Sequence, residues 1–360
     1  TLNSEVSVDQ LPLIAHFGKI VEIATANSDP FYMRARPVSP AQSDAPANWN
    51  EVGWGRVQWR ETAGEEQVLD EFFVCGQFYD DKFFLASSPS KLKTLIENSG
   101  THNAQALADA IPMFVKSAAG DVITNPVPGF IGQQITMLDT FQDRLIVGAG
   151  SVVVMSERSN YFNFYRTTVV TTPESDTVTA SASNIWDDTL RYATHHEMNL
   201  FLHGDKRHYM INGRSPVLPG QTTMAVMWDV QNASNARPVS NGANLFILKE
   251  ELQVGASRLL QVQPGLYQDI PQLQDVSQQL RDYINGYPAE IVAFLNPGTV
   301  FVRTEFVSKS KYGFPRSRPN GLYMYQYTDQ GEQRIVDAWS AWEWDPSIGR
   351  PMGIAPAGYG

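Results

Sequence analysis

The chain has 360 residues and a formal net charge of −11, with 27 Lys and Arg against 38 Asp and Glu. This acidic balance disfavours a protein that binds nucleic acid by neutralising phosphates, because that mode needs Lys and Arg clustered on one face. It does not exclude a channel through which DNA slides, since an acidic wall repels phosphate. The length allows two domains or one large all-β domain, and the 26 Gly and 22 Pro indicate many turns.

The single cysteine, Cys75, excludes an intrachain disulfide and a Cys-rich metal site. No run of about 18 apolar residues is present, so no membrane-spanning helix is expected. Residue 1 is Thr rather than Met and no signal peptide is recognisable, so we expect the chain to be part of a longer product.

Residues 1–116 are predicted to form a β-rich domain at the periphery of the molecule, a platform domain. Residues 19–23 and 31–35 flank a polar turn and are typical of a hairpin. Further strands are predicted over 55–62, 68–73 and 82–85.

A short helix is predicted near residues 89–98. Ser88 suits the N-cap, Pro89 suits the first helical position and Gly100 ends the pattern. Residues 103–111 are typical of either a second short helix or an irregular loop.

Residues 117–134 carry two prolines and three glycines and are predicted to link this region to a second domain over 135–345. There, short strands recur roughly every 8–12 residues, which indicates a sandwich, a barrel or a propeller. Four similar strand groups favour a propeller, although their period is irregular. Residues 272–283 have apolar side chains at helical spacing and predict a helix, and residues 346–360 form a Pro/Gly-rich tail.

The stretch from Asp143 to Tyr165 predicts two short strands joined by a turn at Gly148-Ala149-Gly150. It ends in Tyr161-Phe162-Asn163-Phe164-Tyr165, whose four aromatic side chains each bury about 150–250 Å² when packed. Such a run is either enclosed between sheets or pressed against a partner.

Candidates for chemistry are few. His195, His196, His203 and His208 are dense enough for a zinc site, but polar residues near strand turns are the favoured interpretation. The adjacent carboxylate pairs 65–66, 80–81 and 187–188 are interpreted as solvated turn charges, because general acid–base pairs converge across a cleft instead. The common enzyme motifs are absent. We therefore expect no catalytic residue, no metal and no cofactor.

A basic segment spans Arg303 to Arg318 in this acidic chain. It is interpreted either as a solvated loop or as a contact with an acidic neighbouring subunit or with DNA phosphate. The residues that we predict to lie at an interface are Tyr161, Phe162, Phe164, Tyr165, Lys309, Lys311, Arg316 and Arg318.

An ordered series of segments gives a more specific indication: GD at 120–121, TNPVPGFIG at 124–132, FQDRL at 141–145, SERS at 156–159 and YFNFY at 161–165. This series resembles the tail tubular protein B family, which forms the nozzle of T-seven-like short-tailed bacteriophages (podoviruses). Ile146 stands where that family often has Gly. Weaker similarities extend the resemblance from near residue 11 to near residue 345, including LYMYQY at 322–327 and AWSAWEW at 338–344.

The resemblance implies a structural protein in the tail of the virion, with no enzymatic activity. It implies a sixfold ring (a homohexamer) below the portal that docks to an adaptor ring of the tail tubular protein A type and to tail fibres. DNA would leave through the lumen without sequence-specific binding. The implied fold is mostly β, a β-propeller core with additional small β domains and a few short helices.

Two other classes stay open from the residues alone. A glycan-binding propeller module or glycosidase would use tryptophans as sugar platforms, with candidates Trp54, Trp59, Trp339, Trp342 and Trp344. A protein-binding scaffold unrelated to phage is the third possibility.

Overall fold

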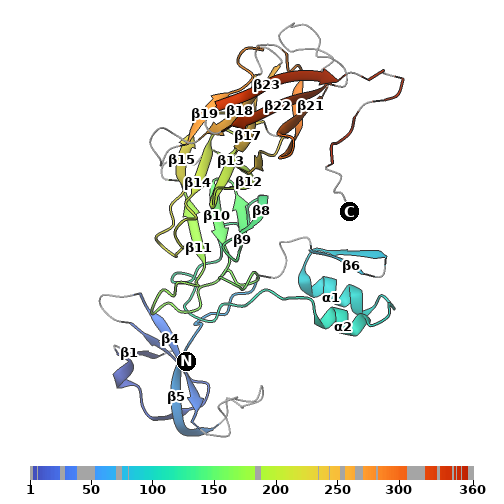
Figure 1. Ribbon diagram of the computed structural model, residues 1–360. Helices are drawn as coiled ribbons and strands as arrows, with labels where there is room; N and C mark the ends of the chain where they lie inside the picture. The colour runs from blue at the N-terminus through green and yellow to red at the C-terminus, as the bar shows by residue number, and fades with distance from the viewer. Residues whose placement is uncertain are drawn as a thin grey trace.

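In the part of the chain that the computed structural model describes, there are five sheets of four or five strands, a two-stranded hairpin and two short α-helices (Figure 1). The prediction of a mostly β chain with few short helices is confirmed. None of the helices in the described part of the chain is long and apolar enough to cross a membrane. The structure describes residues 3–5, 7–24, 29–38, 53–69, 75–79, 81–182, 188–233, 235–242, 244–251, 256–263, 271–280, 283–305, 321–330, 333–342, 344–345, 347–349 and 351–355.

The N-terminal sheet has the strand order β1-β3-β4-β5-β2. Strands β3 and β4 pair antiparallel, which confirms the predicted hairpin, and β1 lies parallel to β3. Alternate residues such as Val21 and Ile23 form its small core. The elements are β1 (Asn3–Glu5), a 3₁₀ turn (Val8–Gln10), β2 (Ile14–His16), β3 (Ile20–Ile23), β4 (Phe31–Pro37) and β5 (Trp54–Thr62).

Residues 75–111 form a separate unit, which we call the arm: β6 (Cys75–Tyr79), β7 (Lys82–Ala86), α1 (Pro89–Glu97) and α2 (Ala104–Asp109). The helix near 89–98 is confirmed, with the Ser88 side chain accepting a hydrogen bond from the Lys91 backbone N–H at 3.2 Å. Of the strand predicted over 68–73, residues 68 and 69 are not in a strand, and Leu69 packs against the aromatic cluster around Phe130 and Phe164. Residues 70–73 lie outside the described residues.

Four antiparallel four-stranded sheets follow one another along the chain. We call them sheets I to IV. Sheet I contains β8 (Ile135–Phe141), β9 (Arg144–Ala149), β10 (Val152–Met155) and β11 (Val178–Ser181). Sheet II contains β12 (Leu190–His196), β13 (Asn199–Gly204), β14 (His208–Ile211) and β15 (Ala225–Trp228). Sheet III contains β16 (Val239–Asn241), β17 (Asn244–Glu251), β18 (Ala256–Gln263) and β19 (Gln272–Asp275). Sheet IV contains β20 (Tyr287–Phe294), β21 (Thr299–Glu305), β22 (Leu322–Gln330) and β23 (Gln333–Trp342).

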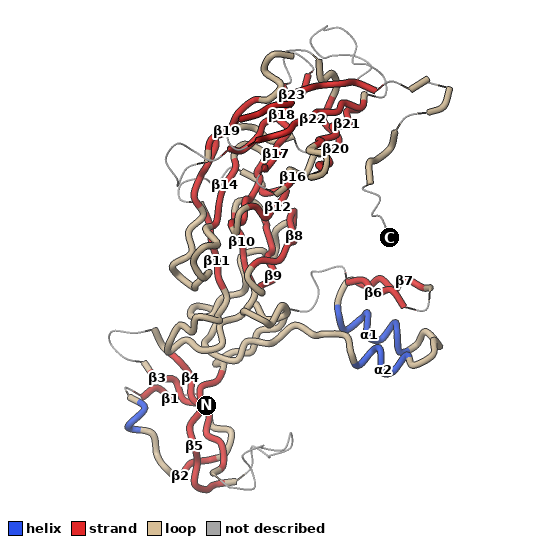
Figure 2. The backbone as a smooth tube through the Cα atoms, in the orientation of Figure 1, coloured by secondary structure: helices blue, strands red, loops and turns tan. Residues whose placement is uncertain are grey.

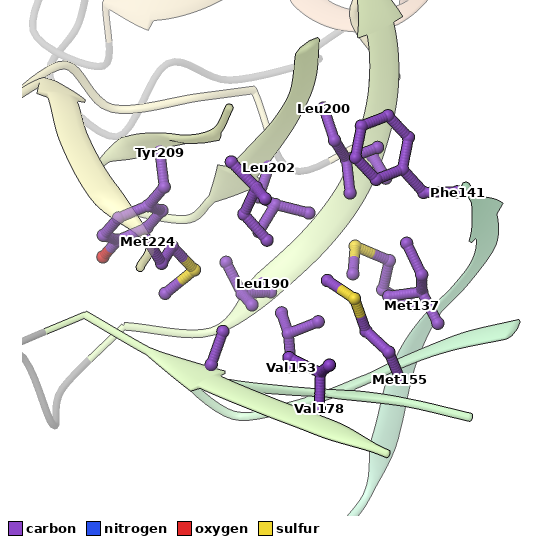
Figure 3. Close-up of a cluster of buried hydrophobic side chains, with 14 of the residues drawn as sticks. Met137, Phe141, Val153, Met155, Val178, Leu190, Leu200, Leu202, Tyr209 and Met224 are labelled. Carbon is purple, nitrogen blue, oxygen red and sulfur yellow. The ribbon is translucent and has the colours of Figure 1, made fainter. Parts of the chain in front are cut away.

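The four sheets are joined by apolar layers, and Figure 2 shows them following one another away from the N-terminal sheet. On β13, Leu200 and Leu202 pack against sheet I (Figure 3). Phe201 between them packs against sheet III. On β17, Leu245 faces sheet II and Phe246 faces sheet IV. Because both faces of these inner strands are buried, their sequences are continuously apolar rather than alternating.

Two predictions within this region are wrong. Residues 272–275 form strand β19 instead of a helix, because Leu273 packs into the layer between sheets II and III while the strand pairs with β18. The turn predicted at 148–150 lies further along the chain. Gly148 is inside β9, and Ala149 pairs with Val152 across a two-residue turn that begins at Gly150, where φ is +58°.

Candidate functional site

The aromatic run, residues 161–165, covers the face of sheet I that points away from sheet II. Phe164 and Tyr165 are 4% and 1% exposed and pack with Val147 and Val154. The Phe164 ring meets Phe130 edge to face, with the ring centroids 5.1 Å apart. These two side chains therefore stabilise the chain itself.

The first half of the run is more accessible. Phe162 is half-buried beside Phe114, with the ring centroids 5.4 Å apart. The Tyr161 side chain is 40% exposed. An intersubunit contact by this run would therefore rest on Tyr161 and Phe162, and it stays a prediction.

Asp143 holds the start of the aromatic run in place. Its carboxylate accepts hydrogen bonds from the hydroxyls of Ser159 and Tyr161, the latter at 2.9 Å. Its backbone C=O accepts from the Ser159 N–H at 2.8 Å. The hydrogen bond from Ser159, followed by the one from Tyr161, makes the largest contribution to lowering the pKa of the Asp143 carboxyl. The hydrogen bond to Asp143 raises the pKa of the Tyr161 hydroxyl.

The turn that carries Asp143 is fixed without glycine. Gln142 and Asp143 both have positive φ, +45° and +61°, in the two-residue connection between β8 and β9. A positive φ costs free energy in a residue with a side chain, and hydrogen bonds of the Gln142 side chain offset this cost. Its amide N–H groups donate to the C=O of Gly213 and Ser215, at 3.0 and 3.1 Å, and its amide oxygen accepts from the Val217 N–H at 2.8 Å. This residue thereby joins sheet I to the loop between β14 and β15 of sheet II.

Arg144 is the largest charged side chain in the interior, at 1% exposure. Its guanidinium donates only to backbone carbonyls, those of Ser156 (2.8 Å), Glu174 (2.8 Å), Ser175 (3.2 Å), Asp176 (2.6 Å) and Val217 (3.4 Å). Burial lowers the pKa of the guanidinium, which stays protonated at any physiological pH. Arg144 therefore acts as a buried brace that joins β9 to three separate loops.

The histidines do not gather into a metal site. His203 and His208 face one another across β13 and β14 with their Nδ1 atoms 2.8 Å apart, and both are fully buried. His195 is half exposed and pairs with Asp139, whereas His196 contacts the Ser240 hydroxyl at 2.9 Å. Within the described ranges, no group of three or more His, Cys, Asp or Glu could hold a metal ion.

The buried histidine pair stays neutral. Burial lowers the pKa of His203 well below its usual range, and it lowers the pKa of His208 to about 4. The Trp228 ring packs against His208 with centroids 6.1 Å apart. The pair is therefore a structural element of the layer between sheets II and III.

The interpretation of Asp188 as a solvated turn charge is wrong. This carboxylate is 3% exposed and accepts from the Tyr209 hydroxyl at 2.7 Å. It also accepts from the backbone N–H groups of Thr189, Lys206 and Arg207, at 2.9 to 3.1 Å. Four donors to one buried carboxylate hold the turn between β13 and β14, a role with no signal in the sequence spacing.

The other predicted site residues are placed as follows. Lys309, Lys311, Arg316 and Arg318 lie outside the described residues. Arg303 precedes them in β21 and pairs with Glu290, Nε to Oε2 at 3.0 Å. Trp54 is 71% exposed in the N-terminal sheet and Trp342 is 46% exposed in sheet IV, so these two side chains belong to different sheets.

Comparison with known proteins identifies the family. A profile described as "Bacteriophage nozzle protein" matches residues 3–350. The chain belongs to the bacteriophage nozzle protein family. It is also similar to tail tubular protein gp12 of Escherichia phage T7, with 23% identity over 234 residues, which are 64% of this chain and 28% of that protein.

The nozzle chain thus spans less than a third of the length of this curated relative. Membership in the family confirms the prediction of a structural component of the phage tail, located in the virion. Solved structures of the N-terminal domain of Nup159 and of a nidogen/laminin complex are remote. The Nup159 domain has a TM-score of 0.34 at 9% identity, and the match covers 74% of this chain and 58% of that domain. The nidogen/laminin structure has a TM-score of 0.29 at 11% identity, and the match covers 54% of this chain and 72% of that one. At these scores, neither structure carries an argument about the fold.

Proposed function

We propose that the chain is a subunit of a sixfold nozzle ring that surrounds the channel for genome ejection and docks to an adaptor ring and tail fibres. The observation that carries this proposal is the family match over residues 3–350, which includes the N-terminal sheet, the arm and all four stacked sheets. A purely structural role without enzymatic activity belongs to the same proposal. The basic residues Lys309, Lys311, Arg316 and Arg318 would contact acidic surfaces of neighbouring subunits.

Within the subunit, we propose that residues 135–345 form a propeller-like body. Four consecutive antiparallel sheets of four strands, packed face to face in chain order, support this arrangement. Residues 1–116 would form the peripheral platform and residues 117–134 the linker. Contacts between these parts include a hydrogen bond from the Tyr32 hydroxyl to Asp121 at 2.8 Å.

DNA would pass through the ring without being held. Each copy carries a net charge of −11, and repetition around an axis multiplies this field. At physiological ionic strength, repulsion acts over about 8 Å, so an acidic wall keeps phosphates from close contact.

Ring formation tests this function. The purified chain, alone and mixed with the adaptor protein of the same phage, should give particles of several copies in mass photometry. Single copies at every concentration, even with adaptor rings present, would contradict the proposal.

A further inference from the structure

The start of the predicted linker is packed closely against other segments of the chain. Gly120 has a φ of +70°. A Cβ atom there would lie 2.6 Å from the Thr124 Oγ1 atom and 2.9 Å from the Val169 Cγ1 atom. The Gly64 N–H donates to the Gly120 C=O at 2.8 Å. Glycine therefore allows this backbone to approach both the end of the N-terminal sheet and the loop at 166–170.

Asp121 divides its carboxylate between its own turn and the N-terminal sheet. Its Oδ1 atom accepts from the backbone N–H groups of Ile123 and Thr124, both at 2.9 Å, and from the Thr124 hydroxyl at 3.0 Å. Its Oδ2 atom accepts from the Tyr32 hydroxyl of β4 at 2.8 Å. The side chain that fixes the turn at 121–124 therefore also holds β4.

Asn125 joins the linker to the loop that follows the aromatic run. This side chain is 2% exposed. Its Nδ2 atom donates to the C=O of Arg166 at 3.1 Å and of Ala119 at 2.9 Å, and its Oδ1 atom accepts from the Arg166 N–H at 3.0 Å. Because one buried side chain binds both backbone groups of Arg166, separating the linker from the loop would leave buried polar groups without partners.

A second contact from the N-terminal sheet reaches the same loop. Glu61 in β5 accepts from the Val169 N–H at 2.8 Å. The loop is held on sheet I in turn, because the Thr167 N–H donates to the Asp176 carboxylate at 3.0 Å. The Asp176 C=O accepts from the Arg144 guanidinium of β9 at 2.6 Å. A continuous series of hydrogen bonds therefore connects β5 to β9.

These contacts are distributed so that the N-terminal sheet cannot bend away from sheet I about one hinge without breaking at least one of them. Tyr32 and Glu61 lie on neighbouring strands and reach two different segments, which Asn125 joins to each other. Figure 2 shows these segments as loops between the N-terminal sheet and sheet I. Parts of a chain joined by a linker move relative to one another by default, so contacts of this kind change the expected behaviour.

We propose that residues 119–125 form a rigid joint that holds the N-terminal sheet in one orientation relative to sheet I, with Asp121, Asn125 and Glu61 as its positioning residues. The joint uses the motif residues at 120–121 and 124–125, to which the sequence resemblance gives no role. This inference concerns a single chain and does not depend on the proposed ring. A partner bound to the N-terminal sheet would be held at a fixed angle to the four stacked sheets.

Replacing Tyr32 by Phe together with Glu61 by Ala tests the joint, because it removes both side-chain contacts of the N-terminal sheet and keeps Asn125. Spin labels carried by p-acetylphenylalanine at Gln58 in β5 and Thr179 in β11, both exposed, report the distance between the two sheets in samples diluted with unlabelled chains. The wild-type chain should give a single narrow distance distribution. In the double variant, the width of the distribution should increase at least about twofold, because parts that lose their contacts move relative to one another.

Hydrogen exchange of the same samples separates loss of orientation from loss of folding. In the double variant, the Val169 amide should exchange at least about tenfold faster, whereas the amides of β3 and β9 should keep their wild-type rates. The control Tyr287→Phe with Glu174→Ala changes the same residue types at exposed positions elsewhere, and the distribution should keep its wild-type width. A broad distribution in the wild-type chain, which needs no variant, would overturn the inference. An unchanged width in the double variant would overturn it as well.

Discussion

Replacing Arg144 by Met should lower the free energy of unfolding by about 4 kcal/mol. The guanidinium, 1% exposed, donates to five backbone carbonyls from residues 156, 174, 175, 176 and 217. Methionine fills similar space but donates nothing, and each buried polar group left without a partner costs about 1–3 kcal/mol. Removing one member of a buried charged network costs about 3–5 kcal/mol. Chemical denaturation at neutral pH would measure the change.

Two further variants separate the hydrogen bonds from charge and volume. Arg144→Lys keeps the charge but cannot reach several carbonyls in a fork, so its loss should be intermediate. Arg214 is exposed, and Arg214→Met should change the free energy of unfolding by less than about 0.5 kcal/mol. Equal stabilities for Arg144→Met and Arg214→Met would refute the bracing role.

Lowering the pH from 6.5 to about 4 should destabilise the protein, with His208 alone accounting for about 3 kcal/mol. Its folded pKa is about 4, below the unfolded value of about 6.5, because burial disfavours the imidazolium. The unfolded chain therefore binds more protons in this range, and stability rises with pH. The contribution is complete above about pH 6.5 and is lost as the pH falls through this window. His203 and His196, whose pKa values are also lowered by burial, act in the same direction.

The pH dependence of the free energy of unfolding, measured by urea titration at several pH values, checks this result. His208→Gln should flatten the slope between pH 6.5 and 4.5, because one buried imidazole is removed. His102 is exposed in the arm, so His102→Gln serves as the control for replacing a histidine elsewhere in the chain. If the slope in His208→Gln equals that of the wild type, the pH dependence of the free energy of unfolding comes from other groups.

Local signals in the sequence identified the elements whose stability is local. Ser88 and Pro89 marked the start of α1 because a side-chain cap and a fixed φ act within one helical turn. The alternation in residues 19–23 and 31–35 identified the first hairpin for the same reason. The ordered motifs between residues 120 and 165 indicated the family, which the match over residues 3–350 confirms.

The elements and buried residues that the sequence did not predict depend on tertiary contacts. Residues 272–283 have apolar side chains at helical spacing, but hydrogen bonds to β18 and burial of Leu273 make residues 272–275 a strand. The buried role of Arg144 depends on loops that lie 30 or more residues further along the chain. The buried role of Asp188 depends on the geometry of the turn between β13 and β14, which the spacing of residues does not encode. The non-glycine turn at Gln142 is held by the loop at 213–217, so it carried no local hairpin signal.

The most direct test of the central claim is cryo-electron microscopy of tails from the phage that encodes this chain. The proposal predicts that the four-sheet body of residues 135–345 repeats six times around the tail axis, enclosing a continuous channel next to the adaptor ring. Density for a single copy, or for copies attached outside a channel that another protein builds, would contradict it.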